Sequence, residues 1–182
     1  MPPLLYFEGR FHSGVKAALC NFCLKSGILC SECQRRLESG EVSDTYLKVA
    51  RLLLSLEEKY PSLQDVYFHK AVEANGVLAL IVGQGDVGNL LAYGGKILRT
   101  IGGKVGRRIR VLEYGASERK FLEDLFAPLN VVTINTIWLP DGTTETRVIL
   151  KRRRRAPSLN MKALKQIAKK VRDMTLRVEF AR

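Results

Sequence analysis

The sequence predicts an α+β fold in which a small cysteine-rich module precedes two copies of one α–β–β–α–β unit. Two observations predict it. All four cysteines of the 182-residue chain fall within fourteen residues, and the order helix, strand, strand, helix, strand can be traced twice after them. A chain of this length suits one ordinary domain or two small ones, and its apolar content of 46% is typical of a packed core. We expect the three units to span residues 1–43, 44–115 and 116–182.

The chain is strongly basic, with a formal net charge of +12 and a pI of about 9.8. Such a charge attracts polyanions, of which nucleic acid is the usual one; a solvated basic surface suited to high salt or heat is the alternative. The excess is greatest in residues 116–182, which carry fifteen Lys and Arg against seven Asp and Glu. We therefore expect nucleic acid as a partner.

The sequence predicts a soluble cytoplasmic protein without a membrane partner. No stretch of it approaches the roughly 20 apolar residues that a membrane helix needs. The N-terminal residues MPPLLYFEGR lack the basic start and the apolar run of a signal peptide.

The cysteine-rich segment reads CNFCLKSGILCSEC, in which Cys20 and Cys23 form one CxxC pair and Cys30 and Cys33 another. Two intervening residues let both thiolates of a pair face one point, and two pairs supply the four sulfur ligands that a structural zinc ion prefers. A disulfide pair, an iron–sulfur site and reactive thiols are the alternatives, and a cytoplasmic location disfavours disulfides. We expect one structural zinc ion in a compact knuckle, because four cysteines leave no open position for catalysis.

The first repeated unit opens with the helical pattern SDTYLKVARLLLSLEEKY, which Ser43 or Asp44 can cap and Pro61 ends. Asn75-Gly76 is a strong hairpin signal because both turn positions favour positive φ. Apolar patterns and glycine breaks predict the remaining elements: strands near 66–74 and 77–82, helices near 87–91 and 96–101 on either side of a break at 93–95, and a strand over 107–114.

The second unit repeats this order. Ser117 caps a helix over 117–126, and Pro140-Asp141-Gly142 joins two strands. A repeat of about 65–70 residues predicts duplicated modules, the second lacking the helix that precedes the break. The expected strands are 131–139 and 143–151, followed by a helix over 161–174 with Met161, Leu164, Ile167 and Val171 on one face and by a strand over 175–180.

The double glycine in residues 89–105, NLLAYGGKILRTIGGKV, indicates an anion site. A helix that stops and restarts at glycines leaves backbone N–H groups free at the start of the second helix. These groups and the helix dipole attract an anion such as phosphate, and glycine lets a nucleotide backbone approach closely.

The stretch VLALIVGQGDVGNLLAYGGKILRTIGGKVGRRIRVLEY resembles a type II KH domain and is similar to the first KH module of the archaeal NusA-like proteins. RKFLEDLFAPLNVVTINTIWLPDG resembles the junction and opening of their second KH module, and LCSECQRRLESGEVS resembles the cysteine-rich extensions of some of these proteins. The resemblance covers residues 44–182. It implies binding of single-stranded RNA, which KH modules clamp with a GXXG loop, in transcription elongation, termination or antitermination, with RNA polymerase as a partner. The alternative is an interaction protein of the ribosome or of RNA processing that uses the KH fold as a platform.

The loop departs from the family pattern, because Ala92-Tyr93-Gly94-Gly95 stands where the family has Gly-x-x-Gly. Tyr93 replaces the usual basic residue and could stack on a base or simply cover the helix end. In the second module Leu159-Asn160-Met161-Lys162 occupies the matching positions without a glycine. We therefore expect this second, degenerate module to serve as a scaffold.

Basic residues beyond the loop extend the candidate RNA surface. The run Arg152 to Arg155 predicts nonspecific, salt-dependent phosphate contacts, with a solvated loop tip or a protein-docking patch as the alternative. Lys104 and Arg110 could lengthen the track in the first module. The candidate RNA-binding residues are Ala92, Tyr93, Gly94, Gly95, Lys96, Arg99, Arg107, Arg108, Arg152, Arg153, Arg154 and Arg155.

The sequence does not predict an enzyme. It contains no recognisable Ser/His/Asp set or paired carboxylates, and its two histidines, His12 and His69, receive no role. Asn89 stands where a P-loop beginning at Gly83 would need its lysine, so we expect no nucleotide cofactor. Cysteine redox chemistry would require that the four thiols bind no metal.

Overall fold

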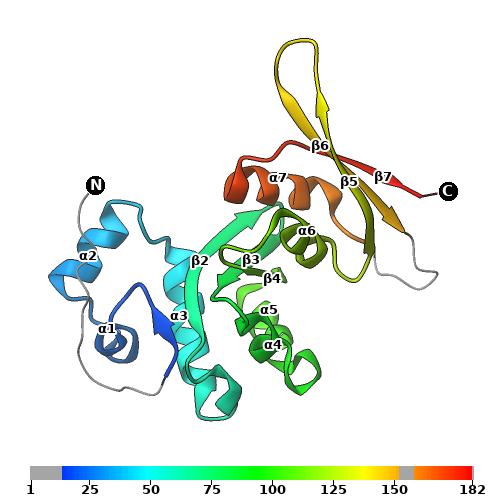
Figure 1. Ribbon diagram of the computed structural model, residues 1–182. Coiled ribbons are helices and arrows are strands. Elements are labelled where there is room, and N and C mark those ends of the chain that lie inside the picture. Colours follow the sequence, from blue (N-terminus) through cyan, green and yellow to red (C-terminus); the bar gives the residue numbers. More distant parts are fainter. Residues whose placement is uncertain (1–13, 152–157, 182) are drawn as a thin grey trace.

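The computed structural model describes residues 14–151 and 158–181 (Figure 1). A small N-terminal module contains strand β1 (Lys16–Ala17) and two short helices, α1 (Asn21–Ser26) and α2 (Ser31–Glu38). It lies beside α3 (Asp44–Glu57), and β1 pairs in parallel with β2 (Tyr67–Ala74), so the module extends the first sheet.

The first unit follows the predicted order. After α3 come a 3₁₀ turn, η1 (Pro61–Leu63), and the antiparallel strands β2 and β3 (Val77–Val82). Helix α4 (Asp86–Leu91), the turn η2 (Tyr93–Gly95) and helix α5 (Lys96–Val105) lead to β4 (Arg108–Glu113), which pairs with β3 in parallel. The sheet order is β1-β2-β3-β4.

The second unit has the same order and the same strand pairing. Helix α6 (Glu118–Phe126) precedes the antiparallel strands β5 (Asn130–Trp138) and β6 (Thr144–Lys151), and α7 (Met161–Arg172) precedes β7 (Leu176–Phe180), which pairs in parallel with β6. The sheet order β5-β6-β7 therefore matches β2-β3-β4. The predicted mixed α+β class and the repeated element order are confirmed.

Strand β3 is buried along its whole length because helices cover both faces of the first sheet. Leu78, Leu80 and Val82 belong to a core formed with α3, α4 and α5. Val77, Ala79 and Ile81 belong to a second core formed with α6 and α7. The second unit thus packs on the back of the first sheet, so the two units form one body. The unit boundaries at 43/44 and 115/116 stay a prediction.

Local signals in the sequence set the ends of several elements. Ser43 accepts a hydrogen bond from the backbone N–H of Tyr46, and Ser117 accepts one from that of Lys120, so both predicted caps are confirmed. Helix α5 runs four residues beyond its predicted end. Glycine at position 102 lets the chain after the helix pass close to it, because a Cβ there would lie only 3.0 Å from the carbonyl oxygen of Arg107.

The hairpin of β5 and β6 projects from the body at the top of Figure 1. Trp138, at the end of β5, is 77% exposed. Within the described residues, no helix has the length and apolar character that crossing a membrane requires.

Candidate metal centre and nucleic-acid interface

The two CxxC pairs occupy the N-termini of two short helices. Cys20 and Cys30 are the extended residues before α1 and α2, while Cys23 and Cys33 lie within the first turn of those helices. The spacing therefore turns both thiols of each pair toward one helix end. Gly27 permits the chain to reverse between the helices, because it ends α1 with φ of 81°.

The structure brings all four sulfur atoms within 4.8 Å of one another. Sγ of Cys20 lies 3.0 Å from Sγ of Cys23 and 3.7 Å from Sγ of Cys33. Four thiolates held about 2.3 Å from a zinc ion in a tetrahedron would be roughly 3.8 Å apart. The four cysteines are therefore placed to hold a four-coordinate metal ion, and Cys23 and Cys33 are buried.

Backbone N–H groups surround the sulfur atoms in a reciprocal pattern. The N–H of Cys30 donates to Sγ of Cys23 over 3.1 Å, and that of Cys20 donates to Sγ of Cys33 over 3.5 Å. A hydrogen bond from the backbone N–H of Cys33 is the main cause that lowers the pKa of Cys30 to about 7. Burial raises the pKa of Cys33 to about 12. A bound cation would supply the positive charge that keeps such buried thiols deprotonated.

The cysteine module is anchored to the first unit by polar contacts. The hydroxyl of Tyr46 accepts from the N–H of Ala18 and donates to the carbonyl of Phe68, each over 2.8 Å. Arg51 of α3 donates from Nη2 to the carbonyl of Gly27 over 3.1 Å. The loop that joins the two CxxC pairs is thus tied to a helix of the first unit.

The predicted break before α5 is a left-handed turn. Tyr93, Gly94 and Gly95 have φ values of 56°, 63° and 73°, which glycine adopts readily and tyrosine rarely does. A Cβ added at Gly94 or Gly95 would meet no atom within 4 Å. The glycines are therefore required for their backbone conformation, and the space outside them is open to a ligand.

The start of α5 has no side-chain cap, although the N–H groups of Gly95 and Lys96 already donate to the carbonyls of Ala92 and Tyr93. Gly95 is the N-cap residue and makes no side-chain hydrogen bond. Lys96 is exposed, and Arg99 donates from Nη2 to the carbonyl of Gly94 over 2.9 Å. A positive helix end next to two basic side chains favours an anion.

The matching position of the second unit is closed. The side chain of Asn160 accepts a hydrogen bond from the N–H of Ala163 and so caps α7. This contrast between α5 and α7 agrees with the loss of glycine from the second loop.

Tyr93 contacts the ring of Tyr60 and also faces solvent. The ring centroids are 5.0 Å apart with the planes tilted by 53°, and Tyr93 is 47% exposed. Its ring is therefore partly covered and partly available to a base.

The arginines before and within β4 have partners in the protein. Arg107 forms an ion pair with Glu73, with Nε 2.5 Å from Oε1, and Arg108 donates to the carbonyl of Ser158 over 3.1 Å. Arg110 donates to the carbonyl of Ala127, and burial lowers its pKa.

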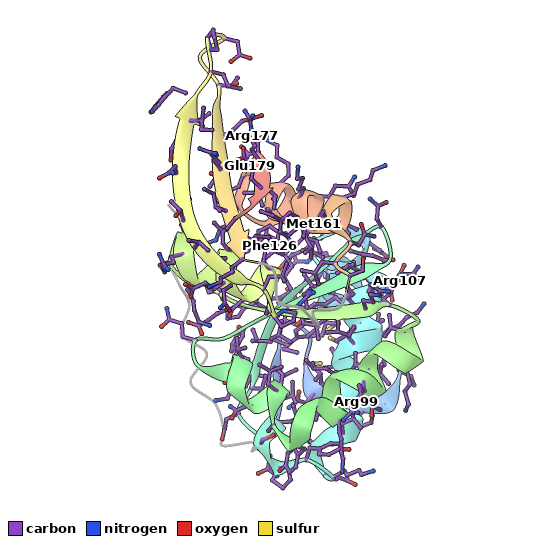
Figure 2. All side chains as sticks on the ribbon, turned by 90° about the vertical axis from the view of Figure 1, so that its right-hand side faces the viewer. Arg99, Arg107, Phe126, Met161, Arg177 and Glu179 are labelled. Carbon is purple, nitrogen blue, oxygen red and sulfur yellow. The ribbon has the colours of Figure 1, made fainter. Side chains whose placement is uncertain are left out.

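Ten residues of α5, about 15 Å of helix, separate the glycine turn from this region, and Figure 2 shows Arg99 and Arg107 apart. Arg152 to Arg155 and His12 lie outside the described residues.

Two features were missed by sequence reasoning. A cavity of about 580 Å³ between α3 and the end of α5 is lined by Lys48 and Arg51 together with the predicted Lys104 and Arg107. The i, i+3 spacing of Lys48 and Arg51 was the available signal, since it places both on one helix face. His69, for which we predicted no role, stacks on Tyr114 with ring centroids 4.1 Å apart and also contacts the tilted ring of Tyr67, 4.2 Å away.

Comparisons with known proteins give a partial sequence relationship. No protein-family model matches the chain. Over 62 residues it is 34% identical to a probable transcription termination protein NusA of Methanocaldococcus jannaschii. The match covers 34% of this chain and 32% of the relative, so the chain aligns with about a third of that protein.

A solved structure, the crystal structure of APE1850, shares 16% sequence identity with the chain at a TM-score of 0.45. The superposition covers 72% of this chain and 96% of the other. At this TM-score and identity the similarity does not establish a common fold.

Proposed function

We propose that the chain binds single-stranded RNA through a KH-like module formed by residues 44–115. The uncapped N-terminus of α5, reached through the left-handed turn Tyr93–Gly95, carries the proposal. Its N–H groups take one backbone phosphate, while Lys96 and Arg99 add charge beside it. Tyr93 offers a ring on which a base stacks. The role is one of binding and involves no catalytic step.

The biological setting that we propose is transcription elongation or termination. The NusA of M. jannaschii, which is described as a probable transcription termination protein, supports this through its partial match. The chain's charge of +12 supports a polyanionic partner. Residues 116–182 form a second, degenerate KH-like module that serves as a scaffold, because its helix α7 is capped by Asn160.

The proposed cofactor is one structural zinc ion held by Cys20, Cys23, Cys30 and Cys33. The closely spaced sulfur atoms and the tetrathiolate donor set support this choice, since zinc favours such sites. The ion would fix the two short helices of residues 1–43 against α3.

A second candidate function is protein docking, with RNA polymerase or a ribosomal particle as the partner. Three exposed hydrophobic side chains favour it: Phe22 and Ile28 in the cysteine module are each 74% exposed, and Trp138 on the projecting hairpin is 77% exposed. Co-purification of polymerase or ribosomal subunits from cell extract, lost on Phe22→Ser/Ile28→Ser, would distinguish this function from RNA binding alone.

The decisive experiment measures binding of a labelled single-stranded RNA pool by the unmodified chain and by Gly94→Asp/Gly95→Asp. Two carboxylates at the turn repel phosphate and fill the open space, so we expect tight binding to be lost while the circular dichroism spectrum is retained. Gly40→Asp/Gly142→Asp is the matched control, because both glycines have positive φ and open surroundings elsewhere in the chain. Equal binding by both double variants would contradict the proposal.

A further inference from the structure

A basic groove lies between α3 and the C-terminal end of α5, on the first unit. We define this α3–α5 groove by its five charged lining residues, Lys48, Arg51, Glu73, Lys104 and Arg107. Its volume is about 580 Å³, and Thr45 and Ser55 also line it. Four cations therefore face a single carboxylate in one concavity.

The carboxylate is already neutralised within the protein. Glu73 accepts an ion pair from Arg107, with Nε 2.5 Å from Oε1. In the described ranges, 14–151 and 158–181, no carboxylate pairs with Lys48, Arg51 or Lys104. Three positive charges in the groove are thus left without a protein counter-charge, which attracts an anionic ligand.

Arg51 shows most clearly that the groove lacks a partner. Its Nη2 is held by the carbonyl of Gly27, whereas its buried Nε has no hydrogen-bond acceptor among the described residues. This Nε has almost no accessible surface, so a phosphate in the groove would meet the remaining N–H groups of the guanidinium, a group that fits phosphate oxygens well. The orientation that Gly27 imposes fixes this guanidinium in the wall of the groove.

We propose that the α3–α5 groove binds backbone phosphates of the RNA strand, as a second contact beside the turn Tyr93–Gly95. The inference rests on the proposed RNA-binding function and adds the residues that carry its salt dependence. Helix α5 joins the two sites, which lie at its opposite ends about 15 Å apart by helix rise. The two sites therefore hold different nucleotides of one strand, and the groove reads no sequence.

Because Gly27 lies between the two CxxC pairs, the cysteine module acts on this groove through Arg51. Arg51 is thus a positioned phosphate ligand, and its position depends on the fold of the segment that carries the cysteines. Arg51→Lys keeps the charge but loses the planar fork that binds Gly27 and a phosphate together. We expect this variant to bind RNA more weakly than the unmodified chain while its circular dichroism spectrum is retained.

The test is a salt series of single-stranded RNA binding with Lys48→Gln/Lys104→Gln. Each phosphate contact to a single strand contributes about 0.7 to the slope of log K against log salt, so we expect the slope to fall by about 1.4. Lys70→Gln/Lys165→Gln removes the same charge at two exposed lysines outside the groove and is expected to leave the slope unchanged.

The outcomes separate the two proposals. If the unmodified chain binds no single-stranded RNA, both fail. Suppose that the unmodified chain binds and that Gly94→Asp/Gly95→Asp abolishes this binding. If Lys48→Gln/Lys104→Gln then has the same salt slope as Lys70→Gln/Lys165→Gln, only the groove proposal fails. The groove proposal is supported if the slope falls in Lys48→Gln/Lys104→Gln and stays unchanged in Lys70→Gln/Lys165→Gln.

Discussion

Arg99 donates a hydrogen bond from Nη2 to the carbonyl oxygen of Gly94, 2.9 Å away and five residues earlier in the chain. The bond spans the turn that precedes α5. It covers a partially negative oxygen with a positive guanidinium beside the N-terminus of α5, which has no side-chain cap. This one contact both holds the left-handed turn and makes its surroundings favourable to phosphate.

Replacing Arg99 with alanine should therefore weaken binding of single-stranded RNA. Hydrogen bonds to charged groups contribute roughly 1.5–3 kcal/mol, and the variant loses both this charge and the brace on the turn. Arg99→Lys, which keeps the charge, should recover part of the affinity. Fluorescence anisotropy with a labelled oligonucleotide measures both, and Arg119→Ala, at an exposed position on α6, is the charge-matched control. Equal losses in Arg99→Ala and Arg119→Ala would show that the position of the arginine is irrelevant.

The backbone conformation of the glycine turn can be tested separately from the attraction of the turn for phosphate. Gly95 has φ of 73° and open space around it, so Gly95→Ala should destabilise the fold by about 1–2 kcal/mol through backbone strain alone. Gly103→Ala, within α5 and also in open space, should instead stabilise it by about 0.5–1 kcal/mol. Urea unfolding of the two variants measures the free energy of unfolding and so shows which change destabilises the fold and which stabilises it. A destabilised Gly103→Ala would indicate that α5 tolerates no added methyl group, whatever its backbone conformation.

Local signals explain why much of this fold could be predicted from the sequence. The caps at Ser43 and Ser117 and the Asn75-Gly76 turn depend on neighbours within three residues, as do the CxxC pairs. The burial of β3 on both faces could not be predicted in this way, because its second cover comes from α6 and α7.

The same limit applies to the candidate interface. The glycine turn is contiguous in the chain, so its position before α5 could be predicted. The α3–α5 groove combines Lys48 with Lys104, which are far apart in sequence and meet only because α3 packs beside α5. Arg107 looked like a free cation in the sequence, whereas the structure pairs it with Glu73 from the neighbouring hairpin.

The second unit should contribute stability and no phosphate clamp. Asn160 caps α7, so Asn160→Ala should lower the free energy of unfolding by about 1 kcal/mol. RNA affinity should not fall, because in the unmodified chain the cap occupies an N–H group that a phosphate would need, so no RNA contact is lost with it. Thermal unfolding and anisotropy on the same samples check both statements. A weaker affinity for RNA in this variant would assign the second loop a direct contact.

The cysteine module should depend on a metal ion for its fold. We expect one zinc per chain by elemental analysis and loss of that zinc in Cys30→Ser, with Ser31→Ala as the control at the next residue. Structural zinc contributes an apparent 10–16 kcal/mol, roughly, to the folding of small metal-binding modules. Chelation should therefore open residues 14–42 to protease, while α6 and α7 stay protected by the core they share with β3.

Because Arg51 is held by Gly27, chelation should also weaken RNA binding, and Arg51→Gln should make that binding insensitive to the chelator. A zinc-free protein with a protected cysteine module would overturn the metal assignment, and chelator-sensitive binding in Arg51→Gln would remove Arg51 as the link.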